Sequence, residues 1–255
     1  MPRFYFDSKS VRDGTVLLDS KESRHAHTVL RLKAGDAVDL MDGAGQEFTG
    51  VVIESRGGRL AVALGAGSKN PAAPFSFALA VSVIRSERME LLIQKSCELG
   101  VSAIFPLLTE RSIVRLSKER WEAKVSRWKK IAMESCKQCG QSKIPSISPV
   151  QFFKDFFSRK LPYEKILIPT LAVSGATLYS SLQSAPSKNI LALVGPEGDF
   201  SKKEAELAIS HQAVPVTLGK LVMRSETAAI YLLSALNFYY GEIDPRDKEH
   251  LRNNL

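Results

Sequence analysis

The feature that most constrains the fold is an alternation of strand-like and helix-like segments from residue 75 onward. Apolar runs of strand length occupy residues 77–84, 101–108, 166–168, 190–194 and 214–218. Segments with helical periodicity lie among them at residues 87–99, 118–139, 151–157, 202–211 and 226–240. The last is apolar on nearly all sides, which predicts burial inside the domain or in a subunit interface. The alternation predicts an α/β domain with a mostly parallel sheet and helices on both faces.

Residues 1–70 have a different pattern. Short apolar or alternating runs at residues 16–18, 37–40, 48–53 and 60–64 are separated by glycine-containing turns, which predicts a small β-barrel or sandwich. Residues 23–32 are an exception and predict a short helix capped by Ser23. The small, proline-rich stretch 65–74 predicts a linker, and the polar stretch 241–255 a frayed tail. We therefore expect two domains, at 1–70 and 75–245.

Composition narrows the class of protein. The 255 residues are 44% hydrophobic and 24% charged, which is typical of a globular chain. No stretch approaches the roughly 18–20 uninterrupted apolar residues that a membrane span needs, and the charged N-terminus lacks an apolar signal core. Three cysteines, an odd number, fit a reducing compartment. We expect a cytoplasmic protein without a membrane partner.

The positive charge is concentrated in the middle of the chain. The net charge is +8, and residues 71–160 hold 16 basic against 8 acidic side chains. On the helix expected at 118–139, Trp121 and Trp128 mark an apolar stripe, and Lys124 and Arg127 fall on the opposite face. Such a field favours a polyanionic partner such as nucleic acid, although a solvated helix face explains it equally well at this level.

Two turns are candidate ligand sites because each follows a strand that the pattern predicts to be buried. Gly195-Pro-Glu-Gly198 precedes a helix that opens with a Ser201/Glu204 capping box. Leu218-Gly219 is followed by Arg224 and Glu226 at the next helix start. In parallel sheets ligands bind beyond the carboxyl ends of the strands. The alternative for residues 195–198 is a tight structural turn, and the alternative for Arg224 and Glu226 is a surface salt bridge.

Several familiar sites are missing. The sequence has no GxxxxGKS/T phosphate loop and no GxSxG elbow, and the missing GxGxxG fingerprint disfavours a dinucleotide-dependent oxidoreductase. Cys136 and Cys139 have no second ligand pair at zinc-finger spacing, so we interpret both as core residues and expect no metal. His25 and His27 lie among arginines, which suits phosphate contact better than metal, with a solvated helix face as the alternative.

Five motifs, in this order along nearly the whole chain, are together more specific than any one alone. They are Arg88-Met-Glu90 with Gln94-Lys95 and Glu98-Leu-Gly-Val101, then Glu134 to Gly140 (ESCKQCG), Gly195 to Gly198, Leu218-Gly219, and Arg224-Ser-Glu-Thr-Ala228. In this order the chain resembles the bacterial ribosomal RNA small subunit methyltransferase E family, a SPOUT-class enzyme family.

The resemblance implies an N-terminal PUA-like β-barrel for RNA and a C-terminal SPOUT α/β domain with a trefoil knot. It further implies a homodimer that binds S-adenosylmethionine and methylates N3 of a specific uridine in 16S rRNA, within the small ribosomal subunit. The competing class is a non-catalytic RNA-binding ribosome assembly factor, which would bind RNA without S-adenosylmethionine.

The resemblance also implies roles for individual residues. It places Arg224 and Glu226 beside the methyl group, with Arg224 as the substrate contact. From that position alone we hypothesise that Arg224 stabilises the uracil imide anion and that Glu226 accepts its proton, directly or through water, so both are candidate catalytic residues. The candidate cofactor-binding residues are Pro169, Thr170, Gly195, Glu197, Gly198, Leu218, Gly219, Val222 and Met223. The candidate RNA-binding residues are Arg24, His25, His27, Arg31, Arg85 and Arg88.

Four positions depart from the family pattern. Asp199 stands where the family usually has a third glycine, and Ser225 replaces the usual threonine. Met223 replaces leucine, and Gln141 stands where an arginine is common. None of these changes removes a group whose chemistry the reaction requires.

Overall fold

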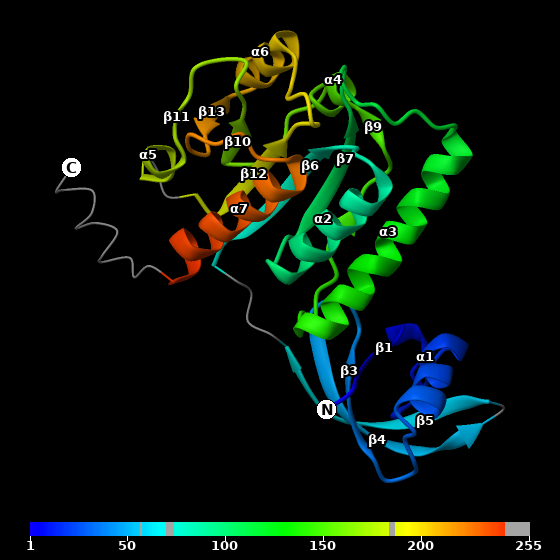
Figure 1. Ribbon diagram of the computed structural model, residues 1–255. Helices are drawn as coiled ribbons and strands as arrows, with labels where there is room; N and C mark the ends of the chain where they lie inside the picture. Colours follow the sequence, from blue (N-terminus) through cyan, green and yellow to red (C-terminus); the bar gives the residue numbers. More distant parts are fainter. Residues whose placement is uncertain (57, 70–73, 184–186, 243–255) are drawn as a thin grey trace. The chain divides into compact units, whose positions relative to one another are not determined.

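The computed structural model describes residues 1–56, 58–69, 74–183 and 187–242 (Figure 1). The chain divides into two compact units, Met1–Ala72 with Ala132–Ile144, and Ala73–Ile131 with Pro145–Leu255. Residues 132–144, which lie inside the range expected for the second domain, therefore cluster with the N-terminal residues. Residues 70–73 of the expected linker and 243–255 of the expected tail lie outside the described residues.

The N-terminal unit contains a five-stranded sheet in the order β1-β3-β4-β5-β2. β1 pairs with β3 in parallel, and the other pairs are antiparallel. All four expected strands are present, and β1 was not expected. The strands are β1 (Arg3–Tyr5), β2 (Thr15–Leu17), β3 (Ala37–Met41), β4 (Gln46–Arg56) and β5 (Arg59–Lys69). Phe4, Val38, Leu40 and Val62 lie in its core.

β5 includes residues 65–69, which the composition had assigned to a linker. The small residues there pair with the start of β4, from Gln46 opposite Lys69 to Phe48 opposite Gly67. A neighbouring strand supplies backbone hydrogen bonds whatever the side chains are, so pairing overrides the weak strand propensity of this stretch. The linker prediction is therefore wrong for residues 65–69.

The short helix of this unit begins earlier than expected. α1 (Ser20–Arg24) is capped by Asp19, whose carboxylate accepts a hydrogen bond from the Glu22 N–H at 2.8 Å, and it continues as the π-helical turn η2 (His25–Val29). Ser23 is buried instead. Its hydroxyl donates to the Leu18 carbonyl at 3.1 Å and accepts from the Leu60 N–H at 2.9 Å. The expected Ser23 cap is wrong because Asp19 takes that position, while Ser23 joins the helix to the sheet.

The second unit contains an eight-stranded sheet in the order β11-β13-β10-β12-β6-β7-β8, with β9 also paired to β7. Every pair in it is parallel, as the alternating pattern predicts. Its strands are β6 (Ser76–Ser82), β7 (Ala103–Leu108), β8 (Ser146–Ile147), β9 (Gln151–Phe152), β10 (Lys165–Pro169), β11 (Ala176–Thr177), β12 (Asn189–Val194) and β13 (Ala213–Thr217).

Helices cover both faces of this sheet (Figure 1). α4 and α6 pack against the face that carries Leu191 and Leu193, and α7 packs against β12 and α2 on the other. The helices are α2 (Ser86–Glu98), α3 (Lys118–Cys139), α4 (Phe153–Phe156), α5 (Leu178–Gln183), α6 (Lys202–Ser210) and α7 (Ser225–Asn237), which ends in the turn η3 (Phe238–Glu242). The last residues of α3, from Ala132 on, belong to the N-terminal unit. The prediction of a helix at 151–157 is wrong for its first two residues, because residues 151–152 pair with β7 as strand β9.

The long helix α3 has the two faces that its periodicity predicts. Trp121 and Trp128 are buried, and on the opposite face Arg127 binds the Glu90 carboxylate through Nε at 2.6 Å and a terminal nitrogen at 2.8 Å. The cysteine interpretation is half right: Cys136 is buried and Cys139 is exposed. Cys139 is the last residue of α3, so its exposure coincides with the end of the helix.

Candidate functional site

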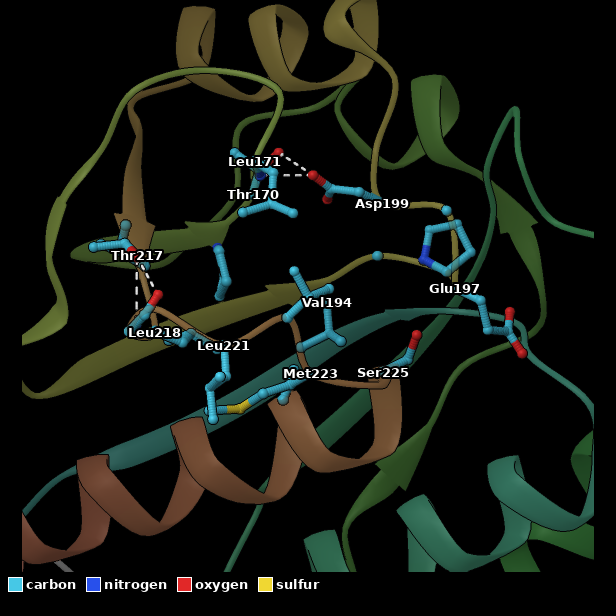
Figure 2. Close-up of a pocket in the computed structure, with 18 residues that line it drawn as sticks. Thr170, Leu171, Val194, Glu197, Asp199, Thr217, Leu218, Leu221, Met223 and Ser225 are labelled. Carbon is cyan, nitrogen blue, oxygen red and sulfur yellow. Dashed lines mark hydrogen bonds between the residues drawn. The ribbon is translucent and has the colours of Figure 1, made fainter.

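A cavity of about 290 Å³ lies at the carboxyl edge of the second unit's sheet (Figure 2). It is formed by the segments that follow β10, β12 and β13, together with the start of α7. These three strands are parallel neighbours, so their carboxyl ends meet at one edge. All nine residues expected to hold a cofactor line this cavity: Pro169, Thr170, Gly195, Glu197, Gly198, Leu218, Gly219, Val222 and Met223.

Close packing explains the glycine at position 195. A Cβ there would lie 3.1 Å from the backbone nitrogen of Phe200 and 3.2 Å from its ring, tighter than most real Cβ contacts. The Asp199 N–H donates to the Pro196 carbonyl at 2.9 Å and closes the turn. Gly219 has a different reason, a φ of +117° that side chains rarely adopt. The two turns recognised in the sequence therefore need glycine for separate physical reasons.

Asp199 joins two segments of the cavity wall. Its Oδ2 accepts hydrogen bonds from the Thr170 hydroxyl at 2.9 Å and the Leu171 N–H at 2.6 Å, as Figure 2 shows. Its Oδ1 accepts from the Phe200 N–H at 2.7 Å. The residue has a φ of +60°, a conformation in which aspartate is better tolerated than most residues. The sequence marked Asp199 only as a departure from a glycine, and its location in a turn did not reveal this bridging role.

The rest of the wall is mostly apolar side chain and backbone. Leu221 and Val222 are 81% and 78% exposed, and Met223 is half-buried beside them. Glu197 and Asp199 are the charged side chains among the described lining residues, and both are acidic. Such a lining suits a ligand that combines apolar surface with positive charge.

A hydroxyl that sequence analysis noted only as a replacement for threonine also lines the cavity. The Ser225 Oγ is buried and has no hydrogen-bond partner among the described residues. Unsatisfied buried polar atoms are rare in folded proteins, so this hydroxyl is available to a bound molecule.

The two candidate catalytic residues lie just outside the lining. Arg224 is exposed at the N-cap of α7, with its side chain free of any cap hydrogen bond. Glu226 is buried, its Oε1 lies 3.7 Å from Nε of Arg88, and its Oε2 has no hydrogen-bond partner within the described part of the chain. Arg88 also contacts Glu197 at 3.4 Å and thereby connects a lining residue to Glu226.

The candidate RNA-binding residues fall in both units. Arg24, His25 and Arg31 are exposed on or just after α1 and η2 in the N-terminal unit, where His27 is half-buried. Arg85 is exposed at the N-cap of α2 in the second unit. Arg88 differs from the others because its guanidinium is already engaged by two carboxylates.

Two other kinds of site can be checked directly. No group of three or more histidine, cysteine or acidic side chains within the described ranges could hold a metal ion. None of the helices in those ranges is long and apolar enough to cross a bilayer.

Comparison with known families agrees with this architecture. Residues 71–237 match the RNA methyltransferase domain family, and residues 18–64 match the RNA methyltransferase PUA domain family. The chain belongs to the ribosomal RNA small subunit methyltransferase E family. The matched methyltransferase region contains every segment that lines the cavity.

Individual relatives are similar to this chain over most of their length. The enzyme from Neisseria gonorrhoeae, solved with S-adenosylmethionine, is 31% identical, with a TM-score of 0.85 over 94% of this chain and 98% of that one. A methyltransferase from Legionella pneumophila, also solved with S-adenosylmethionine, is 32% identical, with a TM-score of 0.84 over 92% and 96%. The Bacillus subtilis member is 26% identical over 88% of this chain and 90% of its own.

Proposed function

We propose that this chain binds S-adenosylmethionine in the cavity after β10, β12 and β13 and methylates N3 of a specific uridine in 16S rRNA of the small ribosomal subunit. The observation that carries the proposal is the convergence of all nine expected residues on one cavity. Similarity to two structures that hold this methyl donor supports it.

The chemistry of the cavity fits the proposed donor. S-adenosylmethionine supplies, when bound, a methyl group on a positively charged sulfonium. The apolar side chains of Leu218, Val222 and Met223 suit its adenosyl part. The carboxylate of Asp199, which has no ion-pair partner among the described residues, favours its positive charge.

The reaction also requires the loss of a proton, because N3 of a neutral uracil carries one. Glu226 accepts this proton in our proposal, directly or through water, and Arg224 stabilises the negative charge left on the ring. The unpartnered Oε2 of Glu226 supports the first role, and the unrestrained exposed side chain of Arg224 supports the second. Holding donor and base together contributes about 7–11 kcal/mol when the geometry is ideal.

The protein acts as a homodimer in our proposal, with residues of α7 at the interface. Tyr231 in α7 and Phe238, which follows it at the start of η3, are apolar side chains that are 44% and 62% exposed. Exposed apolar side chains of this kind are typical of surfaces that become buried on association. Sedimentation at micromolar concentration tests this, and a monomer there would contradict it.

We also propose that the second unit has the trefoil knot of the SPOUT class. Its support is the path from β13 to α7. β13 and β12 lie on opposite sides of β10, yet α7, which follows β13, packs against β12. The connection at residues 218–224 therefore returns past the end of β10, as threading through the preceding loops requires.

One experiment tests the activity as a whole. Small ribosomal subunits from a strain that lacks this protein are incubated with the protein and labelled S-adenosylmethionine, and the modified base is mapped. We expect a single 3-methyluridine in 16S rRNA. Calorimetry with S-adenosylmethionine separates the competing class, because an RNA-binding assembly factor would give no heat of binding.

A further inference from the structure

We propose that a second cavity of the methyltransferase unit binds one nucleotide of single-stranded RNA next to the uridine that is methylated. The inference rests on the proposed function, because it assigns the RNA substrate a second contact in the same unit. The cavity measures about 310 Å³ and lies where β7 and β9 end, beside α4 and α6. Parallel pairing places its strand ends at the same carboxyl edge of the sheet as the donor cavity.

The walls of this second cavity carry an unusual set of side chains. Arg115, Lys154 and Lys203 are exposed around it, and none of them has an ion-pair partner among the residues that the structure describes. Phe152 lies with them, and its side chain is 51% exposed. Cations around an exposed aromatic ring are what single-stranded nucleic acid requires, since the ring stacks a base and the cations neutralise phosphates.

The acidic groups of the same cavity do not cancel this charge. Glu204 is buried and already accepts hydrogen bonds from the backbone N–H groups of Glu110 and Ser201. The Glu110 side chain is exposed and is the one remaining carboxylate of the described lining. Three cations therefore face two carboxylates, one of which is fully used inside the protein, and an anionic partner is favoured.

One short segment borders both cavities. The Glu110 N–H binds Glu204 in the wall of the second cavity, while the guanidinium of the adjacent Arg111 donates to the carbonyl of Gly198 in the wall of the first. Hydrogen bonds among Ser82, Thr109 and Ser112 hold this turn against β6. An RNA strand whose uridine reaches the donor cavity thus meets the second cavity across one rigid turn.

The test replaces the three cations together, as Arg115→Ala, Lys154→Ala and Lys203→Ala. The matched control replaces Arg159, Lys160 and Lys188 by alanine, which removes the same charges from exposed positions before β10 and β12, at the opposite edge of the sheet. Binding of a labelled uridine-rich single-stranded oligoribonucleotide is measured at several salt concentrations, and methylation of unmodified small subunits is measured at several substrate concentrations.

We expect the triple variant to bind the oligoribonucleotide at least about 10-fold more weakly. The slope of log K against log salt should fall by about 1.4, since one nucleotide has two flanking phosphates and each phosphate contact contributes about 0.7. KM for the small subunit should rise while calorimetric affinity for S-adenosylmethionine stays unchanged. Phe152→Ala should weaken binding without changing the salt slope, and Phe152→Trp should restore it, because stacking does not depend on salt.

The inference is overturned if the triple variant and the control lose the same affinity, or if neither loses any. A variant that binds RNA normally but no longer engages ribosomal proteins of the small subunit would also overturn it, in favour of a protein partner. Failure of the proposed function looks different, because S-adenosylmethionine would then fail to bind even the unaltered protein.

Discussion

Carboxylates of the two units have different kinds of partner. In the N-terminal unit, Lys137 of α3 is nearly buried and binds Glu22 at 2.6 Å and Glu134 at 3.0 Å. In the donor cavity of the second unit, Asp199 receives backbone and hydroxyl hydrogen bonds but no ion pair within the described residues. The first arrangement neutralises charge inside the protein, and the second leaves negative charge for a ligand.

The pKa shifts of the N-terminal unit agree with the first arrangement. The pKa of Glu22 is raised above its ordinary value, because burial and the nearby Glu134 and Asp19 together raise it by more than Lys137 lowers it. Burial lowers the pKa of Lys137, but the hydrogen bonds and the charges of Glu22 and Glu134 together raise it by more, so the ammonium stays charged. The charged form of the buried Glu22 side chain is therefore stabilised by Lys137. A count of charged residues does not distinguish such structural pairs from charged groups that contact a ligand. The contacts of each group in the structure make this distinction.

The largest expected effect is a loss of stability when the buried ion pair of the N-terminal unit is removed. Lys137→Met leaves the Glu22 carboxylate buried without its cation, and loss of one partner of a buried pair costs about 3–5 kcal/mol. Thermal or urea unfolding followed by N-terminal-unit probes measures this. Lys21→Ala is the control, since its bond to Glu134 is exposed and should contribute less than about 1 kcal/mol. Equal losses of unfolding free energy in the two variants would contradict the difference between the buried and the exposed ion pair.

The next effect concerns the donor cavity. Gly195→Ala places a Cβ 3.1 Å from the Phe200 nitrogen, which must displace the wall, and we expect S-adenosylmethionine affinity to fall about 100-fold, or about 2.7 kcal/mol. Gly198→Ala is the matched control in the same turn. Its Cβ would meet the flexible side chain of Arg111 at an ordinary 3.4 Å, so affinity should change less than about 3-fold. Calorimetry compares them, and equal affinities would remove the packing argument.

A smaller effect is expected at the bridge between the cavity segments. Asp199→Gly relieves a positive φ but removes three hydrogen bonds, so unfolding stability should change little while donor affinity falls about 10-fold. The donor affinity of Asp199→Asn should lie between that of the glycine variant and that of the unaltered protein, because an amide keeps one of the two acceptor oxygens. If the glycine variant bound the donor as tightly as the unaltered protein, Asp199 would have no part in ordering the site.

The smallest effect is a pH dependence at an exposed pair. Hydrogen bonds from Arg127 hold the pKa of Glu90 below its ordinary value of 4.5. A lowered folded-state pKa gives stability that is present above the ordinary value and is lost as the pH falls through the folded-state value. Unfolding of Arg127→Ala should therefore depend less steeply on pH below about 5 than unfolding of the unaltered protein. Identical acid profiles would contradict this linkage.

Much of the second unit was predictable because its elements are set by local pattern. The runs that became β6, β7, β12 and β13 are apolar on both faces, as strands of a covered parallel sheet must be. The residues of the cavity were named through family resemblance, and their assignment to catalysis and RNA binding stays a prediction. Short elements such as β9 and β11 were missed, since two residues carry no periodicity.

The sequence alone determined the α/β pattern, the two faces of α3 and the turns at 195–198 and 218–219, because each depends on the order of neighbouring residues. Only the tertiary structure decided that Ser23 joins a helix to a sheet, that Lys137 neutralises Glu22, and that Asp199 holds Thr170 and Leu171. These contacts join residues from 28 to 115 positions apart. Whether a charged side chain is a structural partner or a ligand contact depends on what folding brings next to it, which local sequence does not specify.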